Sequence, residues 1–142
     1  MNLIDTNLLI YATFTRMPES VRAREWLSEQ MTDAGAVLCW PVLYAVLRLI
    51  TSWRVAGSST VSVQDGWAVV SAYLAQPAIR MVAAGNGHAA IAAELARTPG
   101  LRSDDVPDIE IAALAIEHGL TLATHDHGFR RFPHLRVVDP LR

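Results

Sequence analysis

Short apolar segments alternate with longer helical patterns along this chain, and that alternation limits the fold more than any other feature of the sequence. The short segments are rich in aliphatic residues, as buried strands are. They cover residues 2–4, 36–40, 79–82, 120–123 and 136–138. Strands separated by helical stretches of about 10–15 residues pair in parallel through right-handed crossovers. The alternation therefore predicts one α/β domain of three layers, with helices on both faces of a central, mostly parallel sheet of about five short strands.

The helical patterns between these strands have recognisable start and stop signals. Pro18 and Glu19 suit the start of a helix, because proline fits the first helical position and an acid favours the positive end of the helix dipole. Residues 33–35 are expected to end this helix, and the segments 57–60 and 99–106 are expected to be loops. The other helices are expected over residues 7–14, 41–50, 63–75, 88–97 and 107–118.

The composition fits a single domain over residues 1–142 and excludes several classes of protein. With 51% apolar and 18% charged residues, the chain is not a disordered tail, a collagen-like repeat or a coiled coil. One cysteine, Cys39, excludes an internal disulfide and a multi-thiolate zinc site. The start of the chain is acidic at Asp5, and the longest apolar run, 36–47, contains Pro41 and is too short to cross a bilayer. We therefore expect a cytoplasmic protein with no membrane partner.

Three acidic residues fall where the predicted strands place them at one edge of the sheet. Asp5 and Asp126 follow the first and fourth strands, and Asp108 lies in the first turn of the helix that leads into the fourth strand. Two carboxylates about 4 Å apart repel by roughly 4 kcal/mol at an effective dielectric near 20, so either protons or a hard metal ion must offset the repulsion. Oxygen ligands suit Mg²⁺ or Mn²⁺, which support phosphodiester hydrolysis. The same aspartates also fit ordinary helix caps, and the spacing alone leaves both interpretations open.

Four segments together resemble a PIN-domain ribonuclease of the VapC toxin type: residues 2–12, 106–115, 123–132 and 135–141. The resemblance implies a PIN-like fold in which Asp5, Asp108 and Asp126 are catalytic and hold the metal. It implies a Mg²⁺-dependent endoribonuclease toxin of a toxin–antitoxin pair, which hydrolyses RNA phosphodiester bonds by metal-activated water. It further implies a homodimer and a cognate antitoxin whose peptide enters the acidic groove.

The sequence departs from that pattern at Ala45, where these proteins often carry a glutamate. Asp105 is the expected substitute as a metal ligand, because it lies three residues before Asp108 at the same helix entrance. Asp104 and Glu110 are further candidates. The alternative is a catalytically impaired PIN module that binds RNA or antitoxin without cleaving. A phosphoryl-aspartate enzyme is disfavoured, because the chain has no lysine and no second acid close after Asp5.

Further side chains are candidates for supporting the metal ligands. Thr6, Asn7 and Thr124 lie beside the proposed ligands, where their side chains either hold a carboxylate or cap a helix. His125 and His127 flank Asp126, but neighbours in sequence rarely complete a zinc site by themselves.

Four arginines are candidates for phosphate contacts with RNA, because guanidinium groups bind phosphate oxygens in pairs: Arg48, Arg54, Arg130 and Arg131. Trp53 is a candidate for base stacking, whereas Trp40 lies in a core-like pattern. The apolar stretch 42–50 is a candidate surface for the dimer partner or the antitoxin. If Asp5, Asp105, Asp108 and Asp126 share one site, the rest of the chain has 12 arginines against 10 acids. The net charge of −2 therefore does not exclude RNA.

Overall fold

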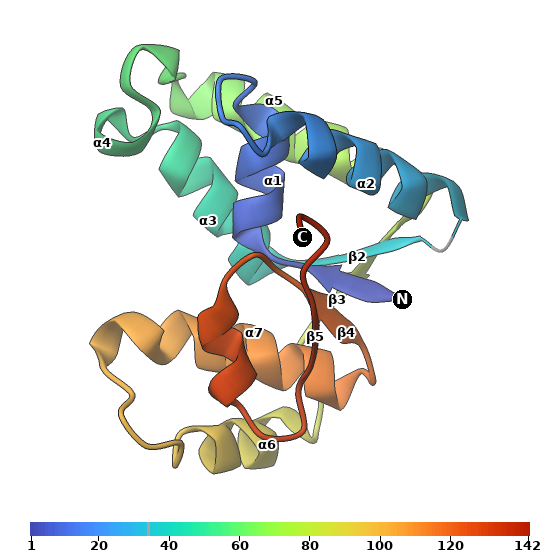
Figure 1. The fold of residues 1–142 in the computed structure, drawn as a ribbon, viewed down its shortest axis with the longest axis vertical. Coiled ribbons are helices and arrows are strands. Elements are labelled where there is room, and N and C mark those ends of the chain that lie inside the picture. Colours follow the sequence, from blue (N-terminus) through green and yellow to red (C-terminus); the bar gives the residue numbers. More distant parts are fainter. Residues whose placement is uncertain (34) are drawn as a thin grey trace.

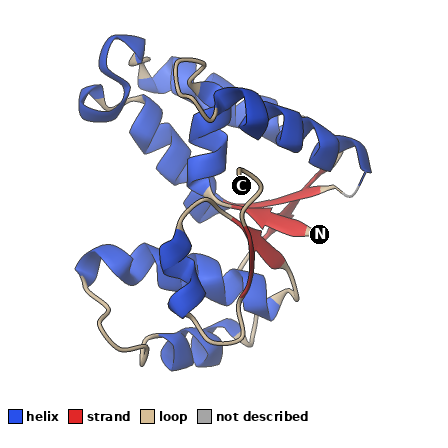
Figure 2. Cartoon of the chain, in the orientation of Figure 1, coloured by secondary structure: helices blue, strands red, loops and turns tan. Residues whose placement is uncertain are grey.

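The sheet has five parallel strands in the order β3-β2-β1-β4-β5, with helices on both of its faces (Figure 1, Figure 2). The computed structural model describes residues 1–33 and 35–142. The strands are β1 (Asn2–Ile4), β2 (Ala36–Cys39), β3 (Ile79–Val82), β4 (Thr121–Ala123) and β5 (Arg136–Val138). The predicted α/β fold and its five strands are confirmed.

Helices α1 to α5 lie on one side of the sheet, and α6 and α7 lie on the other (Figure 1). The longer helices are α1 (Thr6–Thr13), α2 (Ser20–Asp33), α3 (Trp40–Ile50), α5 (Val63–Leu74), α6 (His88–Leu95) and α7 (Val106–Glu117). Shorter turns are α4 (Trp53–Ala56) and the 3₁₀ segments η1 (Gly57–Ser59), η2 (Ser103–Asp105) and η3 (His127–Arg131). The expected loops at 57–60 and 99–106 therefore contain 3₁₀ turns. The expected stop at 33–35 includes residue 34, which lies outside the described residues.

The core lies on both faces of the sheet, which explains why the strands read as continuous apolar runs. All four residues of β2 are buried, as are Leu3 and Ile4 of β1. Helix α3 packs its buried stripe of Val42, Leu43, Val46 and Ile50 against this core. A Cβ on Gly66 of α5 would lie 2.8 Å from Leu47 Cδ1, so glycine lets α5 approach α3 closely.

The strand order places a crevice between β1 and β4. The chain runs from β1 to β2 and β3 on one side of the sheet, and β4 and β5 occupy the other side. In open parallel sheets, ligands bind beyond the carboxyl ends of the strands at such a reversal of order. The backbone continues this pairing past the strands, because Asp5 N–H donates to the carbonyl of Ala123 at 3.0 Å. Asp5 and the loop after β4 therefore emerge side by side.

Two expectations for the apolar segments were wrong or too broad. Trp40 is not a core residue: it begins α3, is 41% exposed and stacks on Trp67 with ring centroids 6.4 Å apart and planes 9° apart. Most of the apolar stretch 42–50 packs into the chain's own core, which leaves Tyr44 as its large exposed residue.

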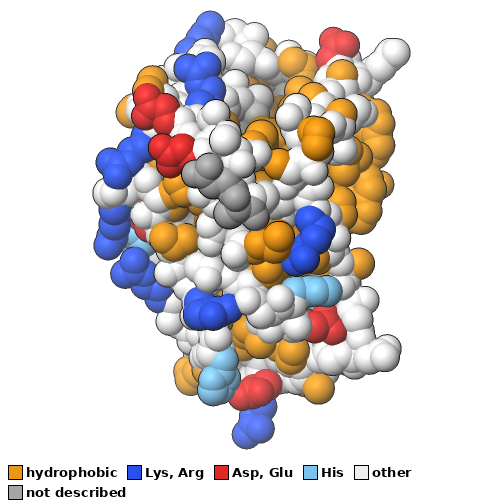
Figure 3. Space-filling model, turned by 90° about the vertical axis from the view of Figure 1, so that its right-hand side faces the viewer, with side chains coloured by type: hydrophobic (Ala, Val, Ile, Leu, Met, Phe, Trp, Pro, Cys, Tyr) orange, Lys and Arg blue, Asp and Glu red, His pale blue; other side chains and the backbone are white. Residues whose placement is uncertain are grey.

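Arginine side chains gather along one edge of the face drawn in Figure 3, and apolar side chains gather at the opposite edge. Among the described helices, none has the length and apolar character that crossing a membrane requires.

Candidate active site

A groove of about 340 Å³ opens at the carboxyl ends of β1 and β4. Its walls combine the three predicted metal-binding aspartates with residues of α1, α3, α7 and η3. The lining residues are Asp5, Thr6, Asn7, Ile10, Tyr11, Pro41, Ala45, Arg48, Leu49, Pro107, Asp108, Ile111, Asp126 and Phe129. The structure therefore brings Asp5 into one concave site with Asp108 and Asp126, which lie more than a hundred residues further along the chain.

Asp5 is a buried carboxylate held in place from three directions. It follows β1 and caps α1, where its Oδ1 accepts a hydrogen bond of 2.7 Å from the backbone N–H of Thr6. Its Oδ2 accepts from Thr124 Oγ1 at 2.6 Å and from Asn7 Nδ2 at 3.0 Å. Burial raises the pKa of Asp5, and the hydrogen bonds from Thr124 and Thr6 oppose that rise. The Asp5 side chain therefore both caps α1 and lines the groove.

Thr124 and Asn7 connect the loop after β4 to the start of α1. Thr124 Oγ1 accepts from Asn7 Nδ2 and from the backbone N–H of Asp126, both at 3.0 Å. Asn7 Oδ1 accepts from the backbone N–H of His125 at 3.3 Å. Both side chains therefore position the groove carboxylates, whereas Thr6 contributes its backbone N–H and part of the groove wall.

Asp108 and Asp126 complete the acidic wall. Asp108 lies in the first turn of α7, and Asp126 caps η3 by accepting from the backbone N–H of Gly128 at 2.8 Å. Desolvation, followed by the charges of Asp126 and Asp5, raises the pKa of Asp108 to about 6. This electrostatic coupling is the repulsion that a bound cation would relieve.

The oxygen-only wall fits a hydrated hard cation. Among the described residues, a single set of three acidic, histidine or cysteine ligands lies within 4.8 Å of one another, and it is not the aspartate trio. Two oxygens on one Mg²⁺ are at most about 4.2 Å apart, given ligand distances of about 2.1 Å. The three aspartates, as placed, are therefore too far apart for all of them to bind one ion directly. Mg²⁺ suits such a site, because it keeps several of its waters.

Asp105 lies beside the groove and not in its wall. Its Oδ2 accepts from the backbone N–H of Arg102 at 2.8 Å, and its Oδ1 accepts from Arg131 at 2.9 Å. The hydrogen bond from Arg102, and then that from Arg131, lower the pKa of Asp105. Arg131 also reaches Asp108 Oδ2 at 3.3 Å, so it links the two carboxylates. Asp105 is therefore connected to the groove through an arginine.

The remaining predicted residues divide between the groove and the surface. Ala45 and Arg48 both lie in the groove wall on α3. Arg54, Arg130, Asp104 and Glu110 are exposed and do not line the groove. Sequence reasoning missed Tyr11 and Phe129 as lining residues, because local sequence does not show whether an aromatic residue faces the core or a groove.

A second hollow of similar size lies at the other end of α1 and offers no site for a hard metal. Its volume is about 370 Å³, and its lining contains no carboxylate. It is formed by Thr13, Phe14, Thr15, Arg16, Met17, Ile50, Val55, Ala56, Ser59, Val61 and Val69. The aspartate groove is therefore the candidate active site.

Comparison with known proteins agrees with this fold and site. The PIN domain family matches residues 3–135. The chain therefore belongs to the PIN-domain family, as its motifs suggest.

Its relatives within that family are VapC proteins. The chain is 34% identical to Ribonuclease VapC33 of Mycobacterium tuberculosis (strain ATCC 25618 / H37Rv), over 100% of this chain and 99% of the relative. Among solved structures, it resembles VapBC2 from Rickettsia felis bound to a promoter DNA fragment, with a TM-score of 0.73, 18% identity and 96% of each chain covered. It also resembles a toxin-antitoxin complex from Klebsiella pneumoniae, with a TM-score of 0.63, 20% identity and coverage of 99% of this chain and 98% of the other. The two structural likenesses support the fold.

Proposed function

We propose that this chain is the endoribonuclease toxin of a toxin–antitoxin pair and that it cleaves RNA with Mg²⁺, or Mn²⁺, held by Asp5, Asp108 and Asp126. The observation that carries this proposal is the groove wall, which three carboxylates line without a histidine or a cysteine. The comparisons support the substrate and the partner, because a relative is named a ribonuclease and a structural neighbour is a toxin-antitoxin complex. A positively charged segment of the antitoxin would complement the same acidic groove.

Each residue of the groove has a role that follows from its contacts. When bound, the ion would supply a Lewis acid that activates water and offsets charge on the phosphate. Asp5 keeps its position through Thr124 and Asn7, which fix both the carboxylate and the loop that carries Asp126. Arg48 in the wall is placed to hold a phosphate of the RNA strand.

In this proposal Asp105 is a possible fourth oxygen ligand, which is paired with Arg131 when no metal is bound. The hydrogen bond from Arg131 to Asp105 Oδ1 has to break before that oxygen can bind the ion. Arg131 would then be free to contact RNA, as would the exposed Arg54 and Arg130 at a greater distance from the groove. In this arrangement Arg131 balances the charge of the groove until a metal enters.

The decisive experiment is cleavage of single-stranded RNA by the purified chain in Mg²⁺. Cleavage by activated water leaves 3′-hydroxyl and 5′-phosphate ends, whereas attack by the ribose 2′-hydroxyl does not. Asp5→Asn should reduce cleavage by at least about 100-fold, since even changes next to metal ligands cost 10–100-fold. Asp104→Asn, on the exposed side of η2, is the matched control. Full cleavage in EDTA or by Asp5→Asn would refute the mechanism.

The alternative, a PIN module that binds RNA or antitoxin without cleaving, rests on Ala45. This residue lies in the groove wall, so a glutamate there would add a fourth carboxylate to the site. Ala45→Glu separates the two hypotheses. A large gain in RNA cleavage from an undetectable baseline would show that the natural chain is impaired, and cleavage that is already measurable and little changed would show a competent three-aspartate site.

We further propose that the chain forms a homodimer through its exposed aromatic patch of Trp40, Tyr44 and Trp67. The three rings lie 5.7 to 6.4 Å apart, and each side chain is at least 41% exposed. Contiguous exposed aromatic surface is characteristic of protein interfaces. Tyr44→Arg should shift the sedimentation of the purified chain from dimer to monomer, and an unchanged sedimentation coefficient would place the dimer contact elsewhere.

A further inference from the structure

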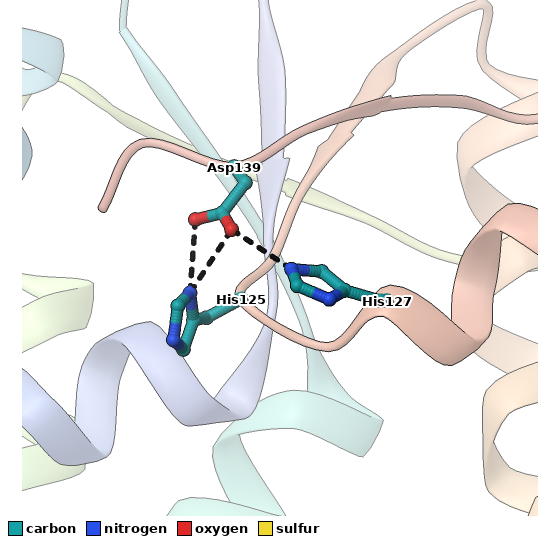
Figure 4. Close-up of side chains that lie close together, drawn as sticks. All are labelled: His125, His127 and Asp139. Atoms are coloured by element: carbon teal, nitrogen blue, oxygen red, sulfur yellow. Dashed lines mark hydrogen bonds and ion pairs between the residues drawn. The ribbon is translucent and has the colours of Figure 1, made fainter. Parts of the chain in front are cut away.

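Two histidines and an aspartate converge on the far side of the loop that carries Asp126. His125 and His127 come from the loop after β4, and Asp139 follows β5 (Figure 4). His125 Nδ1 lies 3.0 Å from each carboxylate oxygen of Asp139, and His127 Nε2 lies 3.2 Å from Asp139 Oδ2. This is the one set of three potential metal ligands within 4.8 Å of one another among the described residues. The cluster lies outside the groove wall.

The spacing of these atoms matches the coordination shell of a small transition-metal ion. Ligands at about 2.0–2.1 Å from a tetrahedral ion are about 3.3 Å apart, which follows from the tetrahedral angle. The separations of 3.0 and 3.2 Å from Asp139 to the two histidines lie close to that value. The ligand atoms of all three side chains lie within 4.8 Å of one another, which is compatible with one ion between them.

The cluster is held by contacts on its outer side, as metal ligands usually are. Asp139 is buried, with 3% of its side chain exposed, and its Oδ1 accepts from the backbone N–H of Leu141 at 3.0 Å. The rings of His125 and Tyr11 form a T-shaped pair with centroids 6.0 Å apart. His127 is 48% exposed, so an ion has a path from solvent and an open position for water.

A cation already lies against this cluster. Arg142 Nε lies 3.3 Å from Asp139 Oδ2, and its Nη2 lies 2.8 Å from Nε2 and 3.2 Å from Nδ1 of His127. Because the two ring nitrogens point in diverging directions, one donor cannot lie in the ring plane along both lone pairs. At most one of these two contacts is therefore a well-aligned hydrogen bond to the ring, and Arg142 also balances the charge of the Asp139 carboxylate. A metal ion would replace Arg142 in its contacts with both the imidazole and the carboxylate.

We propose that His125, His127 and Asp139 form a second metal site, selective for a transition-metal ion such as Zn²⁺ and distinct from the all-oxygen groove. Imidazole nitrogen favours Zn²⁺, Co²⁺ or Ni²⁺ over Mg²⁺, so the two sites select different ions. The bound ion would fasten the segment after β5 to the loop after β4. Its expected effect is on the position and stability of that loop.

The site is tested with Co²⁺ as the probe, added to the full chain in excess Mg²⁺. One Co²⁺ per chain should bind and give the visible d–d absorption of a nitrogen-ligated, low-coordinate ion, and Zn²⁺ should displace it. His127→Ala should weaken binding by at least about tenfold, since changes next to a ligand alone cost 10–100-fold. Arg142→Gln should strengthen binding, because the competing cation is removed.

Two further variants keep the outcome interpretable. His134→Asn removes an exposed histidine elsewhere and keeps a residue that tolerates its positive φ of 65°, so it should leave the Co²⁺ spectrum unchanged. Asp108→Asn disrupts the groove and should also leave that spectrum unchanged. Absence of Co²⁺ binding, or binding that Asp108→Asn abolishes and His127→Ala spares, would overturn the proposal. RNA cleavage is not measured here, so the two proposed sites succeed or fail separately.

Discussion

The groove and the histidine cluster both take residues from one short loop, yet their chemistry differs. Asp126 faces the groove, while His125 and His127 face Asp139 at the end of β5. Asp126 has extended backbone angles, φ −87° and ψ 111°. In extended chain, alternate side chains point to opposite sides. A loop of three residues can thus supply oxygen to one site and nitrogen to another.

Burial acts on the carboxylates of both sites, but the pKa values move in opposite directions. Desolvation raises the pKa of Asp108 to about 6, and the charges of Asp126 and Asp5 add to that rise. Desolvation also acts to raise the pKa of Asp139, but hydrogen bonds from His125, the Leu141 N–H and His127 together hold it below its usual value. Hydrogen-bond donors, rather than depth, separate a satisfied carboxylate from one that needs a cation.

The largest expected difference between the two sites concerns RNA cleavage in Mg²⁺. Asp126→Asn should reduce the rate by at least about 100-fold, because it removes a groove carboxylate. Asp139→Asn should reduce it by no more than several-fold, because Asp139 lies outside the groove. Initial rates on one fluorescent RNA would measure both. Equal losses in the two variants would mean that the loop works as a single site.

The free energy of unfolding in EDTA should show the opposite order: a substitution in the histidine cluster should destabilise the chain, and one in the groove should not. Asp139→Asn should lower the free energy of unfolding by about 1–3 kcal/mol, since its hydrogen-bond donors lose a buried charged acceptor. Asp108→Asn should raise it by about 1 kcal/mol at pH 8, since it relieves repulsion from Asp5 and Asp126. Urea unfolding provides the comparison, with Asp104→Asn expected to have no effect. Destabilisation by Asp108→Asn would contradict the repulsion that we infer.

The pH dependence of Mg²⁺ affinity sharpens the same contrast. The folded-state pKa of Asp108 is raised above 3.8, so its contribution to stability is present at low pH and is lost as pH rises through about 6. Asp139 has a lowered pKa, so its contribution is present above about pH 4 and is lost as pH falls through that lowered value. Mg²⁺ affinity, measured by calorimetry, should therefore rise between pH 5 and 7, as Asp108 loses its proton. Asp108→Asn should remove that step; a step that persists would assign it to another group.

The smallest expected effect concerns Arg131, the arginine beside the groove. Arg131→Gln should raise Mg²⁺ affinity about two- to fivefold, because an exposed ion pair contributes up to about 1 kcal/mol. Arg130→Gln, at the adjacent exposed position, should change the affinity little. A loss of affinity in Arg131→Gln would mean that Arg131 positions Asp108 for the metal and does not compete with it.

Much of the fold and part of the site could be predicted from local sequence. The strand at 36–40 was predicted to within one residue, because a buried parallel strand is apolar at every position. Asp5 could be singled out because a carboxylate directly after such a strand has to emerge at the sheet edge. Trp40 was misassigned, because an aromatic residue between a strand and a proline reads as core until the direction of the helix is known.

The sequence by itself determined the α/β class, the sheet edge and the aspartates at it, because hydrophobic periodicity and strand ends are local properties. Only the tertiary structure decided that Ala45 lies in the groove wall, that Arg131 joins Asp105 to Asp108, and that Asp139 meets His125. The physical reason is that each of these relations depends on how two elements pack, and a contact across 14 or 26 residues leaves no periodic signal in the chain.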